Sequence, residues 1–175
     1  MTGERHRVFL ALGTNLGRRE ANLRAALLHL ASEVEVAAVS RLYETAPAYV
    51  LDQPNFLNIA LEGQTDLSPV ALLDYLKGLE EQLGRETSRR YGPRLIDLDI
   101  LFFDAITLDT PRLTIPHPRL AERAFVLRPL TDIAPDFIHP ILHQSIRDLA
   151  AALPADDGIL SVRPWSPFRA GEAAQ

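Results

Sequence analysis

Two aspartates interrupt an otherwise apolar segment in the second half of the chain. Residues 95–103 read Leu-Ile-Asp-Leu-Asp-Ile-Leu-Phe-Phe, a pattern typical of a buried β-strand. Side chains two residues apart on a strand point to the same side, so the Asp97 and Asp99 carboxylates are expected to project together, about 6–7 Å apart. Like charges on an apolar strand repel each other and lose solvation, so they need a cationic partner such as arginine or Mg²⁺. The alternative is that this side of the strand simply faces solvent.

The order of the predicted elements indicates the fold class. Apolar runs and alternation predict strands, and leucines at helical spacing predict helices. The expected order is strand, helix, strand, strand, helix, strand, over residues 8–12, 20–30, 34–43, 55–62, 69–83 and 95–103. This is the β-α-β-β-α-β order of the ferredoxin-like fold. We expect an α+β two-layer sandwich, a mostly antiparallel sheet with helices on one face, plus C-terminal helical additions at 122–130, where Pro129 should end the helix, and at 145–153.

The domain organisation is expected to be simple. A chain of 175 residues with 47% apolar and 23% charged residues is long enough to bury a sizeable core in one domain. We find no internal repeat and no linker rich enough to separate domains. The sequence therefore predicts one catalytic domain over residues 1–153. From Pro154 onward the chain is polar and contains Pro and Gly, so residues 154–175 are expected to form a loose tail.

Composition and charge exclude several classes of protein. The absence of cysteine excludes disulfides, thiolate metal sites and a cysteine nucleophile. A net charge of -5 argues against a general nucleic-acid partner. No apolar run approaches the roughly 18 residues of a membrane span, and Val8–Leu12 is too short for the core of a signal peptide. We expect a cytoplasmic monomer with no nucleic-acid or membrane partner.

An arginine-rich segment directly precedes the two aspartates. Residues 85–94 contain one acid and four arginines: Arg85, Arg89, Arg90 and Arg94. Guanidinium groups bind phosphate oxygens bidentately, and carboxylates hold the metal that accompanies polyphosphates. Phosphate-binding arginines and metal-binding carboxylates are thus adjacent in the sequence, although the arginines could also be incidental to a surface loop. We predict that this segment closes over a bound nucleotide as a lid.

Two further segments are candidates for ligand contacts. His117 lies between Pro116 and Pro118, where it is well placed to contact a phosphate, although a lone loop histidine usually has no such role. Phe56 and Asn58 are expected on one face of a strand, where a ring and an amide would suit a flat heterocycle. The alternative for this pair is that Phe56 belongs to the core.

Together, these segments resemble the 6-hydroxymethyl-7,8-dihydropterin pyrophosphokinase family. The segment from Gly84-Arg85 through Arg90-Tyr91-Gly92-Pro93-Arg94 to Ile96-Asp97-Leu98-Asp99-Ile100-Leu101 is similar to the family's signature. Other blocks resemble the family in the same order along the chain: residues 11–17, 43–47, 52–58 and 116–125. The resemblance covers roughly residues 8–150.

This resemblance implies a folate-biosynthesis enzyme with a ferredoxin-like fold. Such an enzyme transfers the β,γ-diphosphate of ATP to the 6-hydroxymethyl group of the reduced pterin and releases AMP. By resemblance, Asp97 and Asp99 would hold two Mg²⁺ ions and would act in catalysis with Arg85 and Arg94. The pterin, sandwiched between the two phenylalanines, would contact Thr45, Ala46, Ala48, Phe56, Asn58 and Phe125. ATP would contact Lys77, Arg85, Arg90, Tyr91, Arg94, Ile100, Arg112, Thr114, His117 and Arg123.

The chain departs from the family pattern at three positions. Many members carry an arginine where this sequence has Thr87, and Arg89 is a candidate substitute. Tyr91 stands where tryptophan is frequent, and Lys77 replaces an amide found in some members.

Two other functions remain open from the sequence alone. Another nucleotidyl- or glycosyltransferase with a D-x-D motif would not need a ring-binding set of Phe56, Asn58 and Phe125. A non-catalytic ferredoxin-like module for sensing a ligand or binding RNA would not need Asp97 and Asp99 as a pair.

Overall fold

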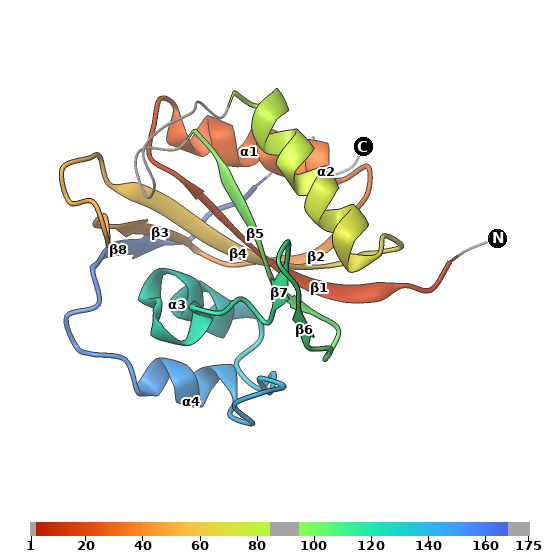
Figure 1. The fold of residues 1–175 in the computed structure, drawn as a ribbon. Coiled ribbons are helices and arrows are strands. Elements are labelled where there is room, and N and C mark those ends of the chain that lie inside the picture. The colour runs from red at the N-terminus through yellow and green to blue at the C-terminus, as the bar shows by residue number, and fades with distance from the viewer. Residues whose placement is uncertain (1–2, 85–94, 168–175) are drawn as a thin grey trace.

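A six-stranded sheet forms the centre of the computed structural model, which describes residues 3–84 and 95–167 (Figure 1). The strand order is β5-β1-β4-β3-β8, with β2 also pairing with β4, and the pairings are antiparallel. With β2 and β3 taken together as one interrupted strand, this is the order expected for the ferredoxin-like fold, which is confirmed. The strands are β1 (His6–Thr14), β2 (Glu35–Val39), β3 (Leu42–Thr45), β4 (Phe56–Thr65), β5 (Asp97–Phe103) and β8 (Ile159–Arg163).

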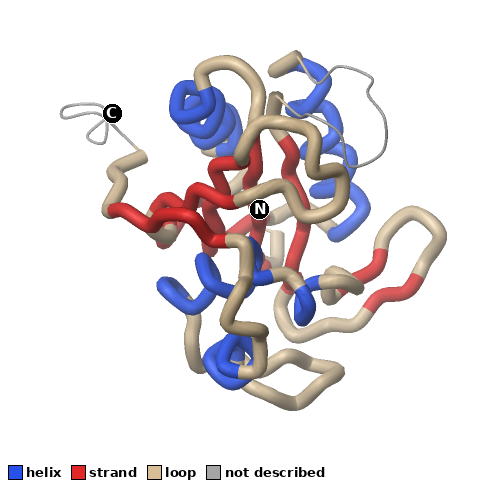
Figure 2. Tube along the Cα trace, turned by 90° about the vertical axis from the view of Figure 1, so that its left-hand side faces the viewer, coloured by secondary structure: helices blue, strands red, loops and turns tan. Residues whose placement is uncertain are grey.

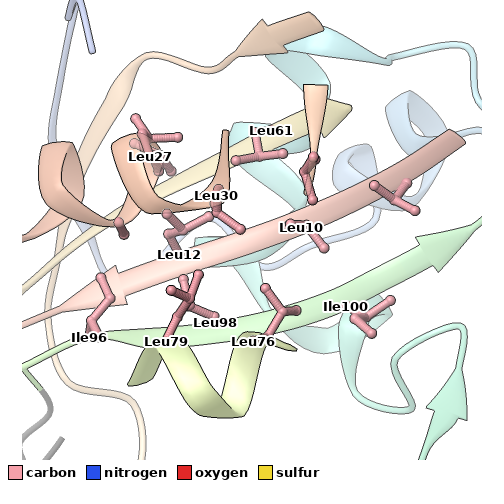
Figure 3. Close-up of a cluster of buried hydrophobic side chains, with 14 of the residues drawn as sticks. Leu10, Leu12, Leu27, Leu30, Leu61, Leu76, Leu79, Ile96, Leu98 and Ile100 are labelled. Atoms are coloured by element: carbon pink, nitrogen blue, oxygen red, sulfur yellow. The ribbon is translucent and has the colours of Figure 1, made fainter. Parts of the chain in front are cut away.

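Two helices, α1 (Arg19–Leu30) and α2 (Pro69–Gln82), cover one face of the sheet. The Ser68 side chain accepts a hydrogen bond from the Ala71 backbone N–H at 3.2 Å, and Pro69 occupies the first turn of α2, so the helix begins where the sequence predicts. Leucines at helical spacing point inward from both helices against alternate residues of β1 and β5. Figure 3 shows part of this cluster: Leu10, Leu12, Leu27, Leu30, Leu76, Leu79, Leu98 and Ile100.

The C-terminal helices form a third layer on the opposite face of the sheet, α3 (Ala124–Ile133) and α4 (Ile146–Ala151). Figure 2 shows the strands between the two groups of helices. Phe9 and Phe102 point toward this third layer and pack with Leu127 and Leu130 of α3. The two-layer sandwich is therefore extended by its C-terminal additions, and β1 is buried on both sides.

Helix α3 corrects one expectation. Pro129 lies inside it and does not end it. Proline removes one backbone hydrogen bond from a helix interior. The burial of Val126, Leu127 and Leu130 against the sheet compensates for this loss, because tertiary packing supplies most helix stability in proteins.

The strand expected at 34–43 is interrupted at Ser40 and Arg41, giving β2 and β3. Ser40 keeps its contact with β4: its backbone N–H donates to the Ala60 carbonyl, and its hydroxyl accepts from the Ala60 N–H, both at 2.9 Å. Two small strands, β6 (Leu108–Asp109) and β7 (Thr114–Ile115), form a separate hairpin, and a 3₁₀ turn spans Leu120–Glu122.

The expectation of a loose tail from residue 154 is wrong for residues 159–165. Strand β8 pairs with β3, from Leu42 opposite Arg163 to Thr45 opposite Ile159. Without β8, β3 would expose a row of unpaired backbone groups at the sheet edge. Trp165 then packs against the α1 side of the core, with the Arg24 guanidinium 5.3 Å from its ring centre.

Among the described helices, none has the length and hydropathy needed to cross a membrane.

Candidate active site

A cavity of about 300 Å³ is lined by residues of the central strands, of α2 and of the start of α3. It contains all the residues predicted for the pterin and both predicted metal ligands. Its walls come from segments that are far apart in the sequence: Ala11, Leu12, Gly13, Thr45, Ala46, Ala48, Tyr49, Gln53, Phe56, Asn58, Lys77, Asp97, Asp99, His117, Arg123, Phe125 and Val126.

The register of three strands brings an amide and a carboxylate to the two sides of one glycine. Gly13 of β1 lies opposite Asn58 of β4 and opposite Asp97 of β5. A Cβ atom at Gly13 would lie 2.8 Å from the Asn58 Oδ1 atom, closer than normal contacts allow. The absence of a side chain at Gly13 thus leaves room for the Asn58 amide in the cavity wall.

The Asn58 amide is held in a defined orientation. Its Nδ2 group donates a hydrogen bond to the Thr45 hydroxyl at 2.7 Å, and both residues are buried. Phe56, at the start of β4, and Phe125, in the first turn of α3, also line the cavity. Phe56 is only partly buried, so its position supports the ligand interpretation over the core interpretation. An oriented amide and two rings can recognise a flat heterocycle.

Asp97 and Asp99 face the cavity, whereas Leu98 between them is in the core. The pKa of the Asp99 carboxyl is raised to about 7, mainly by burial and also by the charge of Asp97, while the Lys77 ammonium opposes the shift. A bound cation would relieve this repulsion. The described residues contain no group of three or more His, Cys, Asp or Glu that could hold a metal. Two carboxylates fit Mg²⁺, which retains waters and takes phosphate oxygens as its other ligands.

Basic and neutral nitrogen donors lie on the other walls. Lys77 of α2 pairs with the buried Glu80, with 3.1 Å between Nζ and Oε1. The pKa of His117 is lowered to about 4, mainly by burial and also by the nearby Arg123 charge, so the ring is neutral at pH 7. Its Nδ1 atom accepts from the Arg119 N–H at 3.3 Å, which leaves the proton on Nε2 as a donor for a ligand.

Sequence comparisons identify the family to which the chain belongs. A family model described as 7,8-dihydro-6-hydroxymethylpterin-pyrophosphokinase (HPPK) matches residues 9–135. The chain belongs to the HPPK family. The 2-amino-4-hydroxy-6-hydroxymethyldihydropteridine pyrophosphokinase of Bacillus subtilis is 48% identical over 127 residues, which cover 71% of this chain and 76% of that protein.

Larger relatives contain an HPPK region as one part of a longer chain. The folic acid synthesis protein FOL1 of Dictyostelium discoideum is 40% identical over 157 residues, 90% of this chain but 24% of that protein. This chain thus spans about a quarter of the length of that relative. The wild-type HPPK-DHPS of Plasmodium falciparum, solved with pteroate, matches with a TM-score of 0.71 and 19% identity, over 86% of this chain and 45% of that one. At this identity the likeness concerns the HPPK fold.

Some residues predicted for ATP do not line the HPPK cavity. Ile100 is buried in the core, and Thr114 lies in β7. Arg112 pairs with Asp74 of α2 on the surface. Their contacts with ATP remain a prediction. The predicted lid, together with the predicted contacts of Arg85, Arg89, Arg90, Tyr91 and Arg94, lies outside the described residues.

Six residues that line the cavity were not predicted as site residues: Ala11, Leu12, Gly13, Tyr49, Gln53 and Val126. Two of them, Gln53 and Tyr49, make polar contacts that matter for the site. Gln53 holds the segment between β3 and β4, because its Oε1 accepts from Asn15 Nδ2 at 2.9 Å and its Nε2 donates to the Val50 carbonyl at 2.7 Å. The Asp52-Gln53-Pro54 block was a signal for this position. Tyr49 stands alone in an irregular segment, and no local pattern pointed to it.

Proposed function

We propose that this protein transfers the β,γ-diphosphate of ATP to the 6-hydroxymethyl group of 6-hydroxymethyl-7,8-dihydropterin, giving AMP and the pterin diphosphate in folate biosynthesis. Membership of the HPPK family and the names of the relatives support this reaction. The observation that carries the proposal is the shared cavity, in which a ring-binding wall adjoins a pair of carboxylates.

The pterin is assigned to the wall that contains Phe56, Phe125 and Asn58. The two rings can stack on the faces of the heterocycle. Because Thr45 fixes the Asn58 amide, that side chain can read the polar edge of the ring without losing conformational freedom on binding. The backbone of Ala46 and Ala48, in the same wall, is suited to further hydrogen bonds along that edge.

The polyphosphate is assigned to the opposite wall. We propose that Asp97 and Asp99 hold two Mg²⁺ ions, which supply charge neutralisation to the phosphates when bound. Lys77 and Arg123 add positive charge, and the neutral His117 donates a hydrogen bond from Nε2. The arginines of residues 85–94 are proposed to complete this set.

The two walls meet at Gly13, where the chemistry is expected. The pterin hydroxyl oxygen attacks the β-phosphorus of ATP and gives up its proton to solvent. The bond from that phosphorus to the α,β-bridging oxygen breaks, so AMP leaves with that oxygen. Such a displacement needs alignment of the reacting groups and neutralisation of charge more than covalent catalysis. The strand register aligns the two ligands because it fixes Asn58 and Asp97 on either side of one residue.

The test is to incubate the protein with ATP, Mg²⁺ and the dihydropterin and to quantify AMP, ADP and the pterin product. Asp97→Asn and Asp99→Asn each remove a charge with little change in shape. Asp109→Asn, on the surface of β6, is the matched control. AMP formed in step with the pterin diphosphate, abolished in both cavity variants and retained in the control, is the expected result.

Other outcomes would refute the proposal in distinguishable ways. Formation of ADP would mean attack on the γ-phosphorus. Turnover that does not need the pterin would favour a different D-x-D transferase. Tight binding of ATP or pterin without any turnover would favour a ligand-sensing module.

A further inference from the structure

The guanidinium of Arg123 is a positive charge at the cavity wall without a carboxylate partner among residues 3–84 and 95–167. Arg123 precedes α3, and its charge acts on both His117 and Asp99. Its Nε donates a hydrogen bond to the Tyr49 hydroxyl at 3.0 Å. The two Nη groups carry the remaining N–H donors of the planar guanidinium, so they can bind an anionic ligand while Nε keeps its bond to Tyr49.

Tyr49 contacts this arginine in two ways. Besides the hydrogen bond, its ring centre lies 5.3 Å from the Arg123 guanidinium carbon, within the range of cation–π attraction. Arg119 also packs on this ring, at 4.4 Å, but its Nε binds Glu122 at 2.6 Å. The same ring therefore supports two arginines, of which Arg123 alone lines the cavity.

The position of Tyr49 in the chain gives this contact a role. It lies between β3 and β4, one residue after Ala48, which lines the pterin wall. Contacts that hold this segment include the Ala46 N–H, which donates to the Gly158 carbonyl at 2.8 Å, and Gln53 Nε2, which donates to the Val50 carbonyl. The Tyr49 side chain, which comes from the segment of the pterin wall, thus contacts Arg123, which is assigned to the phosphate wall.

We propose that Tyr49 is a positioning residue, whose hydroxyl and ring hold Arg123 so that its Nη groups face the polyphosphate of ATP. A long arginine side chain loses rotational freedom when it binds a ligand. Tyr49 restricts that freedom before the nucleotide arrives, which lowers the entropy cost of binding. The inference rests on the proposed function in that it requires a nucleotide in the cavity.

The test measures binding of a nucleotide that cannot react, the α,β-methylene analogue of ATP with Mg²⁺, and separately binding of the dihydropterin. Tyr49→Phe removes the hydrogen bond and keeps the ring, so nucleotide affinity should fall about fivefold. Tyr49→Ala removes both contacts and should weaken binding about twentyfold. In turnover, KM for ATP should rise in Tyr49→Phe while kcat stays within twofold. Pterin affinity in this variant should be unchanged.

A double-mutant cycle shows whether Tyr49 acts through Arg123. In an Arg123→Met background, Tyr49→Phe should have no further effect on nucleotide affinity. Tyr75→Phe is the matched control, because it also removes a tyrosine hydroxyl, one that contacts Ser32 and His29 between α2 and the end of α1. It should leave both affinities unchanged.

Three results would overturn the inference: equal nucleotide affinity in wild type and Tyr49→Phe, parallel losses of nucleotide and pterin affinity, or additive effects in the cycle. A wild-type protein that does not bind the analogue would overturn both this inference and the proposed function. Tight analogue binding without AMP formation would refute the proposed reaction only, and the cycle would still decide the role of Tyr49.

Discussion

Replacing Gly13 with alanine should separate pterin binding from nucleotide binding. The new Cβ would lie 2.8 Å from Asn58 Oδ1, whereas ordinary contacts begin near 3.4 Å, so the amide has to move by about half an ångström. The Asn58 amide can move only by weakening its 2.7 Å bond to the Thr45 hydroxyl. Both groups are buried, so the loss costs about 1–3 kcal/mol.

This strain should appear mainly in the pterin site. We expect Gly13→Ala to lower dihydropterin affinity by about tenfold to a hundredfold, since each 1.4 kcal/mol corresponds to a factor of ten. Affinity for the non-reactive ATP analogue should change by less than about threefold, because the substitution changes no side chain of the phosphate wall. Titration calorimetry with each ligand, together with thermal unfolding, measures both quantities.

Two other glycines serve as controls. Gly78, in α2, has no atom within 4 Å of an added Cβ, so Gly78→Ala should stabilise the fold by about 0.5–1 kcal/mol without affecting either ligand. At Gly63 an added Cβ would lie 2.9 Å from the Glu35 carbonyl, away from the cavity, so Gly63→Ala should reduce stability alone. The reasoning fails if Gly13→Ala keeps wild-type pterin affinity, or if it loses both ligands in the same proportion as Gly63→Ala.

Three further predictions follow from the charges and the sheet edge. The raised pKa of Asp99 means that the folded state loses stability as the pH rises from about 4 to about 7, because the buried carboxyl resists ionisation. Asp99→Asn should therefore melt about 2–6 °C higher than wild type at pH 8, while losing activity. An unchanged or lower melting temperature would contradict the assigned burial of Asp99. The lowered pKa of His117 means that the unfolded chain takes up a proton first as the pH falls from 6.5 toward 4, so the folded state loses stability over that window. His117→Asn should show a smaller decrease in melting temperature between pH 6.5 and 4.5, and parallel melting profiles would contradict the prediction. A chain ending after Gly158 lacks β8 and Trp165; it should melt at least about 5 °C lower and aggregate faster in light scattering through the exposed edge of β3, whereas wild-type melting would show that β8 contributes no stability.

Strong local patterns in the sequence predicted the order of the helices and strands and the paired carboxylates of the site. The leucines of α2 recur at helical spacing between a capping serine and a glycine, so the element could be placed from sequence alone. Asp97 and Asp99 were conspicuous because carboxylates are rare on apolar strands, and the structure places both in the cavity. These signals are local, and each depends on the physics of one element.

The features that were missed depend on contacts between distant segments. Strand β8 has mostly exposed side chains and is formed by pairing with β3, which no local pattern indicates. Helix α3 continues through Pro129 because the sheet buries its apolar side chains. The contact between Tyr49 and Arg123 joins residues in two irregular segments, so it becomes visible only when the fold brings them together.

The position of β8 has a consequence for the order in which the chain acquires its structure during synthesis. Leu42 and Arg163 are paired neighbours in the sheet although most of the chain lies between them. A ribosome releases the N-terminal part first, so β3 is available long before its partner emerges. The β3 edge therefore stays open to other chains until residues 159–163 have emerged and paired with it.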